Sequence, residues 1–406
     1  MIHQARVQPV PFLRRVALRN YKSIAACDVE LQPLTLIVGR NGSGKSNFLD
    51  ALRFVTDALR TSLDHALRER GGIREVRRRS TGHPTHFRIG LSLNLPDGGM
   101  GEYQFQIGAQ KEGAWEVTDE RCHVETPLRE LHEFHVRAGQ VVRSSEQVLP
   151  PLSADRLLLS TVGGFPAFRA VHDGLSRMGF YSLNPSQVRA LQPPDAGDLL
   201  LRDGRNIASV LGQLETRAPE TKQRVVEYLN RVVPGVKDVT KRALGQYETL
   251  EFRQLVAGSK EPWTFLASNM SDGTLRALGI LVALFQTAAD PARHVPVVGI
   301  EEPEVALHPA ATGVLMGCLE EASTTTQVLV TSHSADLLDN ARIPEDAILV
   351  ANSDEGVTRL AELDEVGLSV IRDHLYSPGE LLRQDQLQPA KQPPSRARNS
   401  ALFEEE

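Results

Sequence analysis

The chain has 406 residues, a formal net charge of −6 and 41% hydrophobic residues, enough for a sizeable core, and the negative charge argues against nucleic-acid binding over its whole surface. Its three cysteines lie far apart and form no C-x-x-C pair, so we expect free thiols rather than a disulfide framework or zinc site. Residues 1–15 lack the apolar core of a signal peptide, and the apolar run 278–285 is too short to cross a bilayer, so we expect a cytoplasmic protein without a membrane partner.

In chain order, the first strong signal is a glycine-rich loop between a strand and a helix. Residues 12–38 read as strands, GRNGSGKS follows at 39–46, and a helical pattern then runs to about residue 69. This is the phosphate-loop motif G-x-x-x-x-G-K-[ST] in the context that confirms it. Glycines let backbone N–H groups converge on phosphate oxygens, Lys45 reaches the β- and γ-phosphates, and the Ser46 hydroxyl can ligate Mg²⁺. The expected nucleotide-binding residues are Gly39, Asn41, Gly42, Ser43, Gly44, Lys45, Ser46 and Asn47.

The middle of the chain changes character twice. Residues 86–124 alternate apolar and polar side chains around the turn Pro96-Asp97-Gly98-Gly99, which predicts an antiparallel β-lobe. From about residue 128 to residue 229 the pattern is mostly helical and is broken by recurring prolines. We therefore expect an insertion of several short helices rather than a long coiled coil.

The last part alternates strands and helices, which indicates a mainly parallel sheet. The expected elements are strands at 231–253, 295–300 and 327–330, helices at 271–287, 310–322 and 335–340, and a hairpin at 347–360. The predicted fold is α/β, a phosphate-loop NTPase with an antiparallel β-lobe and a helical insertion. Its expected parts are 12–127, the insertion 128–230, 231–382, and a disordered tail at 383–406 that is rich in Gln, Pro, Arg and Glu.

Two acidic residues follow the buried strand 295–300. Glu301 and Glu302 stand at its carboxyl end, where ligands bind in open α/β sheets. This is the Walker B arrangement: the first acid helps to hold Mg²⁺, directly or through water, and the second polarises the attacking water. Surface acids after a strand are common, but the phosphate loop upstream favours the functional interpretation.

Two further polar clusters lie near helix starts. Thr331-Ser332-His333-Ser334 follows a buried strand, so His333 is placed to meet a γ-phosphate, while the serines can cap the next helix. Ser271-Asp272-Gly273-Thr274 opens the helix 271–287. A plain N-cap accounts for it, and a second anion site made from a serine hydroxyl, a glycine N–H and a helix N-terminus accounts for it equally.

Together these segments resemble an ABC-type ATPase head of the SMC/RecF/OLD group, and within it the short ATPases called "AAA family ATPase" or AAA_21 type. The residues that carry the resemblance are Asn20-Tyr21-Lys22-Ser23, GRNGSGKSNFLDAL at 39–52, SDGTLRAL at 271–278, IEEPEVALHP at 300–309, TSHS at 331–334 and YSPGEL at 376–381.

The resemblance implies a mechanism that the residues alone do not show. Two copies would pair head-to-tail around two ATP molecules with Mg²⁺, and Ser271 and Gly273 of one copy would contact the γ-phosphate held by the other. Glu302 would be the catalytic base, His333 the switch histidine and Lys45 a further catalytic group. Glu304 and His308 would lie in a loop that faces the partner.

Three departures from the family pattern matter. Position 301 is Glu where the wider ABC group usually has Asp, so direct ligation of Mg²⁺ by Glu301 is in doubt. No glutamine sits in a recognisable Gln-loop motif. The long coiled coil, zinc hook and nuclease domain that define the targets of related proteins are missing from the pattern.

An arginine cluster offers one contact site for a target. Its members lie within twelve residues: Arg68, Arg70, Arg74, Arg77, Arg78 and Arg79. They suit the phosphate backbone of duplex DNA, but a solvated helix end accounts for such a run at least as well.

Two functions remain open. One is an ATPase that acts on DNA in repair or antiviral defence. The other is an ATP-driven switch or scaffold that controls a partner effector protein without touching DNA. A transporter motor fits less well, because the SDGT signature departs from the transporter form.

Overall fold

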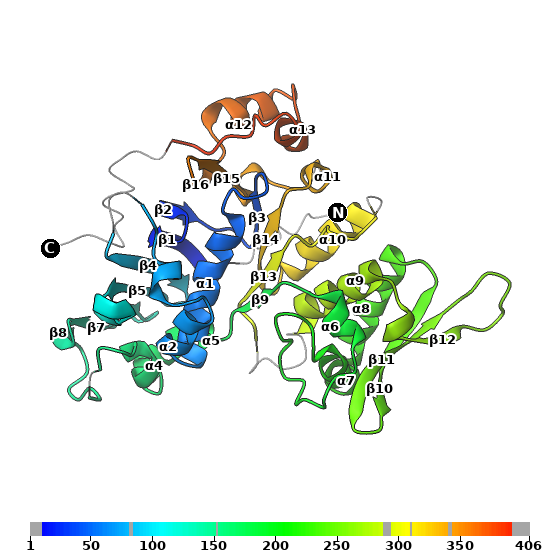
Figure 1. Cartoon of the computed structure of the whole chain (residues 1–406), viewed down its shortest axis with the longest axis horizontal. Coiled ribbons are helices and arrows are strands. Elements are labelled where there is room, and N and C mark those ends of the chain that lie inside the picture. Colours follow the sequence, from blue (N-terminus) through cyan, green and yellow to red (C-terminus); the bar gives the residue numbers. More distant parts are fainter. Residues whose placement is uncertain are drawn as a thin grey trace. The chain divides into compact units, whose positions relative to one another are not determined.

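The computed structural model describes residues 10–80, 84–151, 153–286, 294–308, 311–339 and 343–391. The chain divides into two compact units (Figure 1). Unit 1 comprises residues 1–178 and 343–406, and unit 2 comprises residues 179–342.

Unit 1 is a mixed sheet with helices packed on it. Its strands are β1 (Leu13–Tyr21), β2 (Ile24–Glu30), β3 (Leu34–Val38), β4 (His86–Asn94), β5 (Met100–Ala109), β6 (Trp115–Glu125), β7 (Leu131–Arg137), β8 (Gln140–Ser144), β15 (Ile348–Asp354) and β16 (Val357–Glu362). They lie in the order β8-β7-β6-β5-β4-β1-β2-β16-β15-β3. Pairing is antiparallel from β8 to β2, whereas β16 with β2 and β15 with β3 are parallel.

The helices of unit 1 are α1 (Lys45–Arg60), α2 (Leu63–Arg68), α3 (Ile73–Val76), α4 (Leu158–Val162), α5 (Pro166–Ser176), α12 (Glu365–Arg372) and α13 (Pro378–Arg383), with short 3₁₀ turns at Lys111–Gly113 and Glu345–Ala347. Helix α1 packs on the sheet through aromatic rings. Phe54 meets Tyr21, Phe87 and Phe105 with ring centroids 5.5–6.3 Å apart. The contacts with Tyr21 and Phe87 are edge-to-face, and this packing helps to fix α1 and the loop that precedes it.

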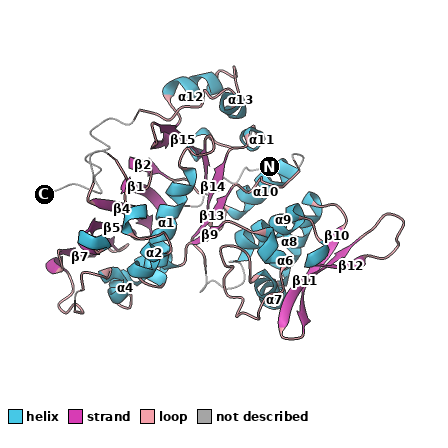
Figure 2. Cartoon of the chain, viewed as in Figure 1, coloured by secondary structure: helices cyan, strands magenta, loops and turns pink. Residues whose placement is uncertain are grey.

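Unit 2 combines a small parallel sheet with a helical cluster (Figure 2). Strand β13 (Val297–Glu301) pairs in parallel with β14 (Gln327–Ser332) and with β9 (Gly179–Tyr181). The helices are α6 (Pro185–Arg189), α7 (Ile207–Arg217), α8 (Pro219–Val232), α9 (Asp272–Phe285), α10 (Thr312–Ala322) and α11 (Ala335–Leu338), and a 3₁₀ turn spans Ala267–Asn269. A separate antiparallel sheet has the order β10 (Val236–Leu244), β11 (Tyr247–Gln254), β12 (Trp263–Leu266).

The α/β class and the antiparallel β-lobe agree with the sequence prediction. The boundaries between the parts of the chain differ from the predicted ones. The region 128–230, expected to be a helical insertion, begins with β7 and β8, and the unit boundary falls at residue 178. The alternation in Leu131–Arg137 places Phe134 and Val136 on the buried face, which is the pattern of a strand.

The C-terminal part also differs from the expectation. Residues 384–391 continue beyond α13 and bond to β16, where Leu363 bridges Pro389. The expected disorder of the tail beyond residue 391 lies outside the described residues. Within the described ranges, no helix combines the length and apolar composition that a membrane crossing needs.

Candidate nucleotide site

The phosphate loop of unit 1 links β3 to the start of α1. Three of its glycines have positive φ angles: 153° at Gly39, 80° at Gly42 and 97° at Gly44. A side chain at Gly39 would collide with the carbonyl oxygen of Ala351, and one at Gly44 would collide with Thr358. These positions therefore need glycine for conformation and for space.

Two polar side chains of this loop, those of Ser43 and Lys45, are buried. Lys45 is 4% exposed, and its Nζ donates to the carbonyl oxygens of Gly39 (2.8 Å) and Arg40 (2.9 Å). The Oγ atom of Ser43 is buried and has no hydrogen-bond partner among the described residues. The buried Ser43 hydroxyl without a hydrogen-bond partner and the Lys45 ammonium that bonds to carbonyl oxygens of its own loop both suit a bound phosphate group.

The remaining residues of the phosphate loop differ in whether their side chains are exposed or bonded within the protein. Ser46 is exposed on the first turn of α1, so its hydroxyl is available to a metal ion. Asn41 and Gly42 are also exposed. The Asn47 side chain instead donates to Ser23 Oγ at 2.7 Å, and its N–H donates to the Gly44 carbonyl oxygen at 3.0 Å, so its expected role in nucleotide binding stays a prediction.

Thr358 on β16 lies far from the phosphate loop in sequence but forms a hydrogen bond with it. Its Oγ1 donates to the Ser43 carbonyl oxygen (3.0 Å) and shares a hydrogen bond of 2.7 Å with Ser23 Oγ. Neither role was predicted. Ser23 lies within the segment 20–23 that helped to define the resemblance, whereas nothing local marks Thr358 as functional.

In unit 2 the two Walker B acids stand where β13 ends. Glu302 has a φ of 44°, an uncommon left-handed conformation for this residue, and its N–H donates to the Thr331 carbonyl oxygen at 2.9 Å. Its Oε1 lies 3.3 Å from Nδ1 of His333 on the loop after β14. Both side chains are a little over one-third exposed. The structure therefore brings Glu302 and His333 together.

Glu304 belongs to the same cluster, although the resemblance placed it in a loop facing a partner. Its Oε1 accepts hydrogen bonds from Ser332 Oγ (2.6 Å) and the His333 N–H (3.2 Å), and lies 3.7 Å from His333 Nδ1. The side chain is only 11% exposed, because it turns inward to satisfy these donors. His308, from the same expected loop, is exposed.

The first acid, Glu301, has a different environment. Its Oε1 pairs with Arg202 at 3.1 Å, so an ion that uses Glu301 must first displace the guanidinium. Ser46, the other expected metal ligand, belongs to unit 1. Among the described residues, no group of three His, Cys, Asp or Glu side chains suits a metal ion.

Arg276 on α9 fixes the backbone of both acids and was missed by the sequence analysis. Its Nη2 donates to the carbonyl oxygens of Glu301 (3.2 Å) and Glu302 (3.0 Å). Burial lowers the pKa of the Arg276 guanidinium, and the nearby glutamates oppose that shift. Because it lies five residues after Ser271, this arginine ties the helix that carries the signature to the end of β13 in the same unit.

The signature residues occupy the start of α9. Ser271 is the N-cap: its Oγ accepts from the Thr274 N–H at 3.2 Å, so the capping role is present. A side chain at Gly273 would collide with the Ala306 carbonyl oxygen. Ser271 is exposed, which leaves its hydroxyl accessible for a second role.

Two family models match the chain in separate parts. One described as "AAA domain, putative AbiEii toxin, Type IV TA system" matches residues 189–339, and one described as "AAA ATPase domain" matches residues 12–89. The DNA replication and repair protein RecF of Gloeobacter violaceus is 35% identical over 85 residues, which are 21% of this chain and 22% of that protein. The match thus spans about a fifth of the relative's length.

Solved structures give the fold. An SMC head bound to the C-winged helix domain of ScpA superposes with a TM-score of 0.56 at 14% identity, covering 88% of this chain and all of that one. The SMC head from Pyrococcus furiosus, bound to the C-terminal domain of ScpA, gives a TM-score of 0.55 at 14% identity and covers 90% of this chain and all of that one. Together these matches support an ABC-type ATPase head of the SMC/RecF-like kind.

The arginine cluster of this ATPase head is smaller than predicted. Arg70 is buried: it bonds to Asp50 (3.0 Å) and Asp57 (2.9 Å), and its guanidinium lies 5.2 Å from the centre of the Phe54 ring. It therefore holds α1 and cannot meet a DNA phosphate. Arg68 pairs with Asp64, and Arg79 pairs with Glu75. Arg74, Arg77 and Arg78 remain as the members without an acidic partner among the described residues.

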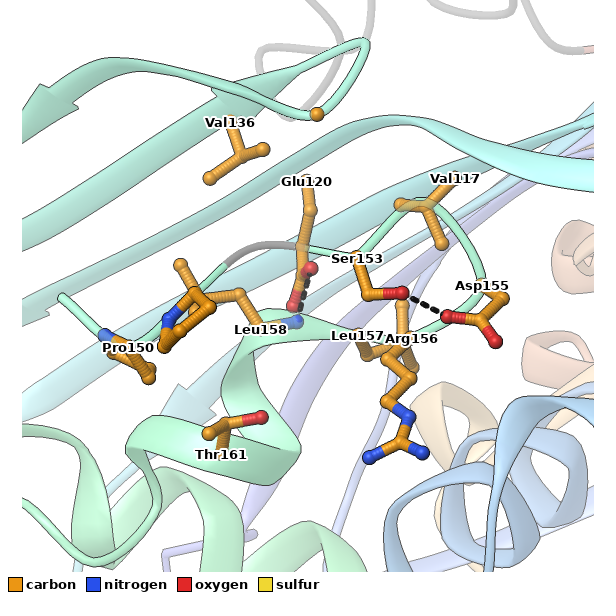
Figure 3. Close-up of a pocket in the computed structure, with 12 residues that line it drawn as sticks. Val117, Glu120, Val136, Pro150, Ser153, Asp155, Arg156, Leu157, Leu158 and Thr161 are labelled. Carbon is orange, nitrogen blue, oxygen red and sulfur yellow. Dashed lines mark hydrogen bonds between the residues drawn. The ribbon is translucent and has the colours of Figure 1, made fainter.

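The ATPase head also has a cavity of about 220 Å³ in unit 1, beside β6 (Figure 3). Glu120 points toward it and is 1% exposed; it accepts hydrogen bonds from the N–H groups of Leu158 (2.6 Å) and Leu159 (2.9 Å) and from the Tyr103 hydroxyl (3.0 Å). Burial raises the pKa of Glu120 to about 7, although these donors favour the charged form.

Proposed function

We propose that this head binds ATP with Mg²⁺ and hydrolyses it to ADP and phosphate. The phosphate loop would hold the triphosphate, with Lys45 and the Ser43 hydroxyl on its oxygens and the Ser46 hydroxyl on the metal ion, which would neutralise phosphate charge when bound. Glu302 would accept the proton of the attacking water, and His333 would contact the γ-phosphate. The observation that carries the proposal is the 3.3 Å approach of Glu302 to His333 at the carboxyl end of β13.

We further propose that two copies pair head-to-tail around ATP. Ser271 and Gly273 of one copy would contact the nucleotide that the other copy holds. The exposed Ser271 hydroxyl at the N-terminus of α9, a helix of 14 residues, supports this role, because a helix start of this kind attracts anions.

One experiment tests both statements: ATP binding, ATP turnover and mass in solution for the wild type, Lys45→Ala and Ser271→Arg. Loss of the lysine's charge-assisted contacts should weaken ATP binding on the order of 100-fold. Ser271→Arg should bind ATP normally but fail to dimerise or turn over. Ser268→Arg, a change at an exposed position three residues earlier, serves as the matched control. Normal ATP affinity in Lys45→Ala would refute the phosphate-loop assignment, and normal turnover in Ser271→Arg would refute the contact between copies.

For the biological role we propose action on DNA, in repair or defence. The RecF relative is named for DNA replication and repair, and the AAA model that matches residues 189–339 is named for a toxin system. Arg74, Arg77 and Arg78 are the residues left to contact a phosphate backbone. Duplex DNA should stimulate turnover, and Arg77→Glu should remove the stimulation while basal turnover continues.

A second candidate, an ATP-driven switch that controls a partner protein, is favoured by apolar side chains of α12 that the described part of unit 1 leaves exposed. Only Gly367 of this eight-residue helix is buried. Turnover that is indifferent to DNA would favour this candidate over the first.

A further inference from the structure

Helices α12 and α13 carry an apolar surface that the other described residues of unit 1 leave exposed. Val366 is 71% exposed, Leu375 is 65% exposed and Tyr376 is 43% exposed. They form one surface, because Val366 and Val370 lie one turn apart on α12 and the Leu375 N–H donates to the Val370 carbonyl oxygen at 3.1 Å. Figure 1 shows α12 and α13 as a projecting pair next to β15 and β16. Clustered exposed apolar side chains of this kind mark interaction sites.

The charges around this surface select its occupant. Between residues 362 and 385 the chain has six carboxylates against two arginines: Glu362, Asp364, Glu365, Asp373, Glu380 and Asp385, with Arg372 and Arg383. Arg372 is already paired with Glu345 at 2.8 Å and Asp385 with Arg40 at 2.9 Å, which leaves five carboxylates beside Arg383. An acidic rim repels nucleic acid and an identical surface on a second copy, whereas it attracts a basic partner.

The same segment reaches the phosphate loop. After α13 the chain turns at Asp385, whose carboxylate pairs with Arg40 at 2.9 Å. Arg40 is part of the phosphate loop, and its carbonyl oxygen accepts a hydrogen bond from Lys45 Nζ. The segment is also anchored to β15 through Asn352 and Gln388 (2.9 Å). A bound phosphate that attracts Lys45 Nζ would break its hydrogen bond to the Arg40 carbonyl oxygen. Because Arg40 also pairs with Asp385, this change would affect the Arg40–Asp385 ion pair.

We propose that α12 and α13 form a docking surface for a basic, amphipathic segment of a partner protein, tied to the phosphate loop by the Arg40–Asp385 ion pair. Leu and similar side chains of the partner fill the surface around Val366 and Leu375, and its Lys and Arg side chains meet the acidic rim. The proposed effect of the phosphate loop on this docking surface rests on the proposed ATP binding. The docking of the partner segment does not rest on it.

The first test measures binding of labelled model peptides to the full chain without nucleotide. The probe is a peptide of Leu and Lys with helical amphipathic spacing, compared with one in which Glu replaces Lys. The double variant Val366→Asn, Leu375→Asn should bind the Lys probe about tenfold more weakly, the effect expected of removing two interface anchors. The matched control is Leu131→Asn, Val142→Asn, which changes two residues of the β-lobe that are each 58% exposed and should leave affinity within about twofold.

Three results would overturn the docking proposal. The first is equal binding by both double variants. The second is binding of the Glu probe as tight as that of the Lys probe. The third is a wild-type mass in solution that shows self-association lost in Val366→Asn, Leu375→Asn, since the occupant would then be a second copy.

The second test adds a non-hydrolysable ATP analogue with Mg²⁺. Affinity for the Lys probe should change about threefold in the wild type, a modest shift in keeping with an exposed ion pair, and should not change in Asp385→Asn. Asp354→Asn is the control, because its pair with Arg359 (3.1 Å) involves an aspartate that is equally 61% exposed. A wild type that does not bind the analogue refutes the proposed ATP binding alone. A wild type that binds it with unchanged probe affinity refutes the tie to the loop.

Discussion

Two acids of unit 1, Asp50 and Glu120, are buried more deeply than the two acids at the end of β13 in unit 2. In unit 1, the Asp50 side chain is 14% exposed and lies within 3.4 Å of Lys22, Arg53 and Arg70, and Glu120 is 1% exposed among N–H and O–H donors. In unit 2, the Glu301 and Glu302 side chains are 27% and 35% exposed at the end of β13. Asp50 and Glu120 are matched by partners inside unit 1, whereas Glu302 keeps its carboxylate partly exposed at the end of β13.

This difference separates acids that stabilise the fold from acids that can do chemistry. Burial raises the pKa of Asp50, but Arg70 and Lys22 outweigh it, so the pKa lies below its ordinary value and the carboxylate stays charged as part of α1 packing. An acid that acts on a ligand needs an unsatisfied oxygen within reach of that ligand. Replacing acids and their partners in the two units should therefore affect different properties.

The largest expected effect is that of Glu302→Gln on turnover. Removing a general base should lower kcat on the order of 10²–10⁴-fold. ATP affinity and the urea midpoint should stay near wild type, because the side chain is 35% exposed and its amide replacement has the same shape. The check is steady-state ATP turnover beside equilibrium ATP binding. Near-normal kcat would assign the base elsewhere, and a large fall in the urea midpoint would place Glu302 among the structural acids.

The second effect concerns stability. Arg70→Met should destabilise unit 1 by about 3–5 kcal/mol, the cost of leaving Asp50 and Asp57 without their buried partner. Urea unfolding measures it, and Arg79→Met is the control, since its exposed pair with Glu75 should contribute less than about 1 kcal/mol. Equal effects of the two changes would mean that Arg70 is a surface residue and would restore the full arginine cluster as a DNA site.

The wrong prediction for Arg70 shows that the local sequence does not reveal which arginine of a run is buried. Its partners Asp50 and Asp57 lie 20 and 13 residues earlier, on the face of α1 that turns toward it. The arginine run looks uniform in sequence, and only helix packing separates the buried member from the exposed ones. Likewise, Arg276 and Thr358 act through carbonyl groups placed by strand register; Thr358 and Ser43 are 315 positions apart.

The phosphate loop could be predicted as a motif because its residues are contiguous and its glycines are demanded by backbone geometry. Glu302 and His333 could be predicted because each follows an apolar strand, and neighbouring parallel strands bring their carboxyl ends together. The orientation of Glu304 could not, because it depends on whether Ser332 Oγ or solvent satisfies its carboxylate.

The third prediction uses pH. In the folded state the pKa of Glu120 is about 7 against an ordinary value of 4.5, so between these values the folded chain binds more protons than the unfolded chain. Stability should therefore fall as pH rises through this window, by about 3 kcal/mol in total. The lowered pKa values of Asp50 and Asp119 act in the opposite sense and at lower pH.

Urea unfolding at pH 5 and pH 7.5 measures this slope. In Glu120→Gln the slope should be reduced, because the amide does not titrate. The exposed Glu130→Gln is the control and should keep the wild-type slope. A slope unchanged in Glu120→Gln would assign it to another group.

The smallest effect is expected at Glu304, which is the sharpest test of the comparison because it lies beside Glu302 and His333 but is as buried as Asp50. Glu304→Gln keeps an oxygen for Ser332 and the His333 N–H but removes the charge 3.7 Å from His333 Nδ1. If Glu304 positions His333, kcat should fall about tenfold, the loss of one charge-assisted contact, with KM within about twofold and the dimer mass unchanged. Glu304→Ala should lower kcat further, because it also removes the acceptor, so the Gln variant acts as a partial rescue.

His308→Ala, in the same loop but exposed, is the control and should leave the monomer's ATP affinity intact. Loss of dimer mass in Glu304→Gln without a change in single-turnover rate would instead place Glu304 in a contact between copies.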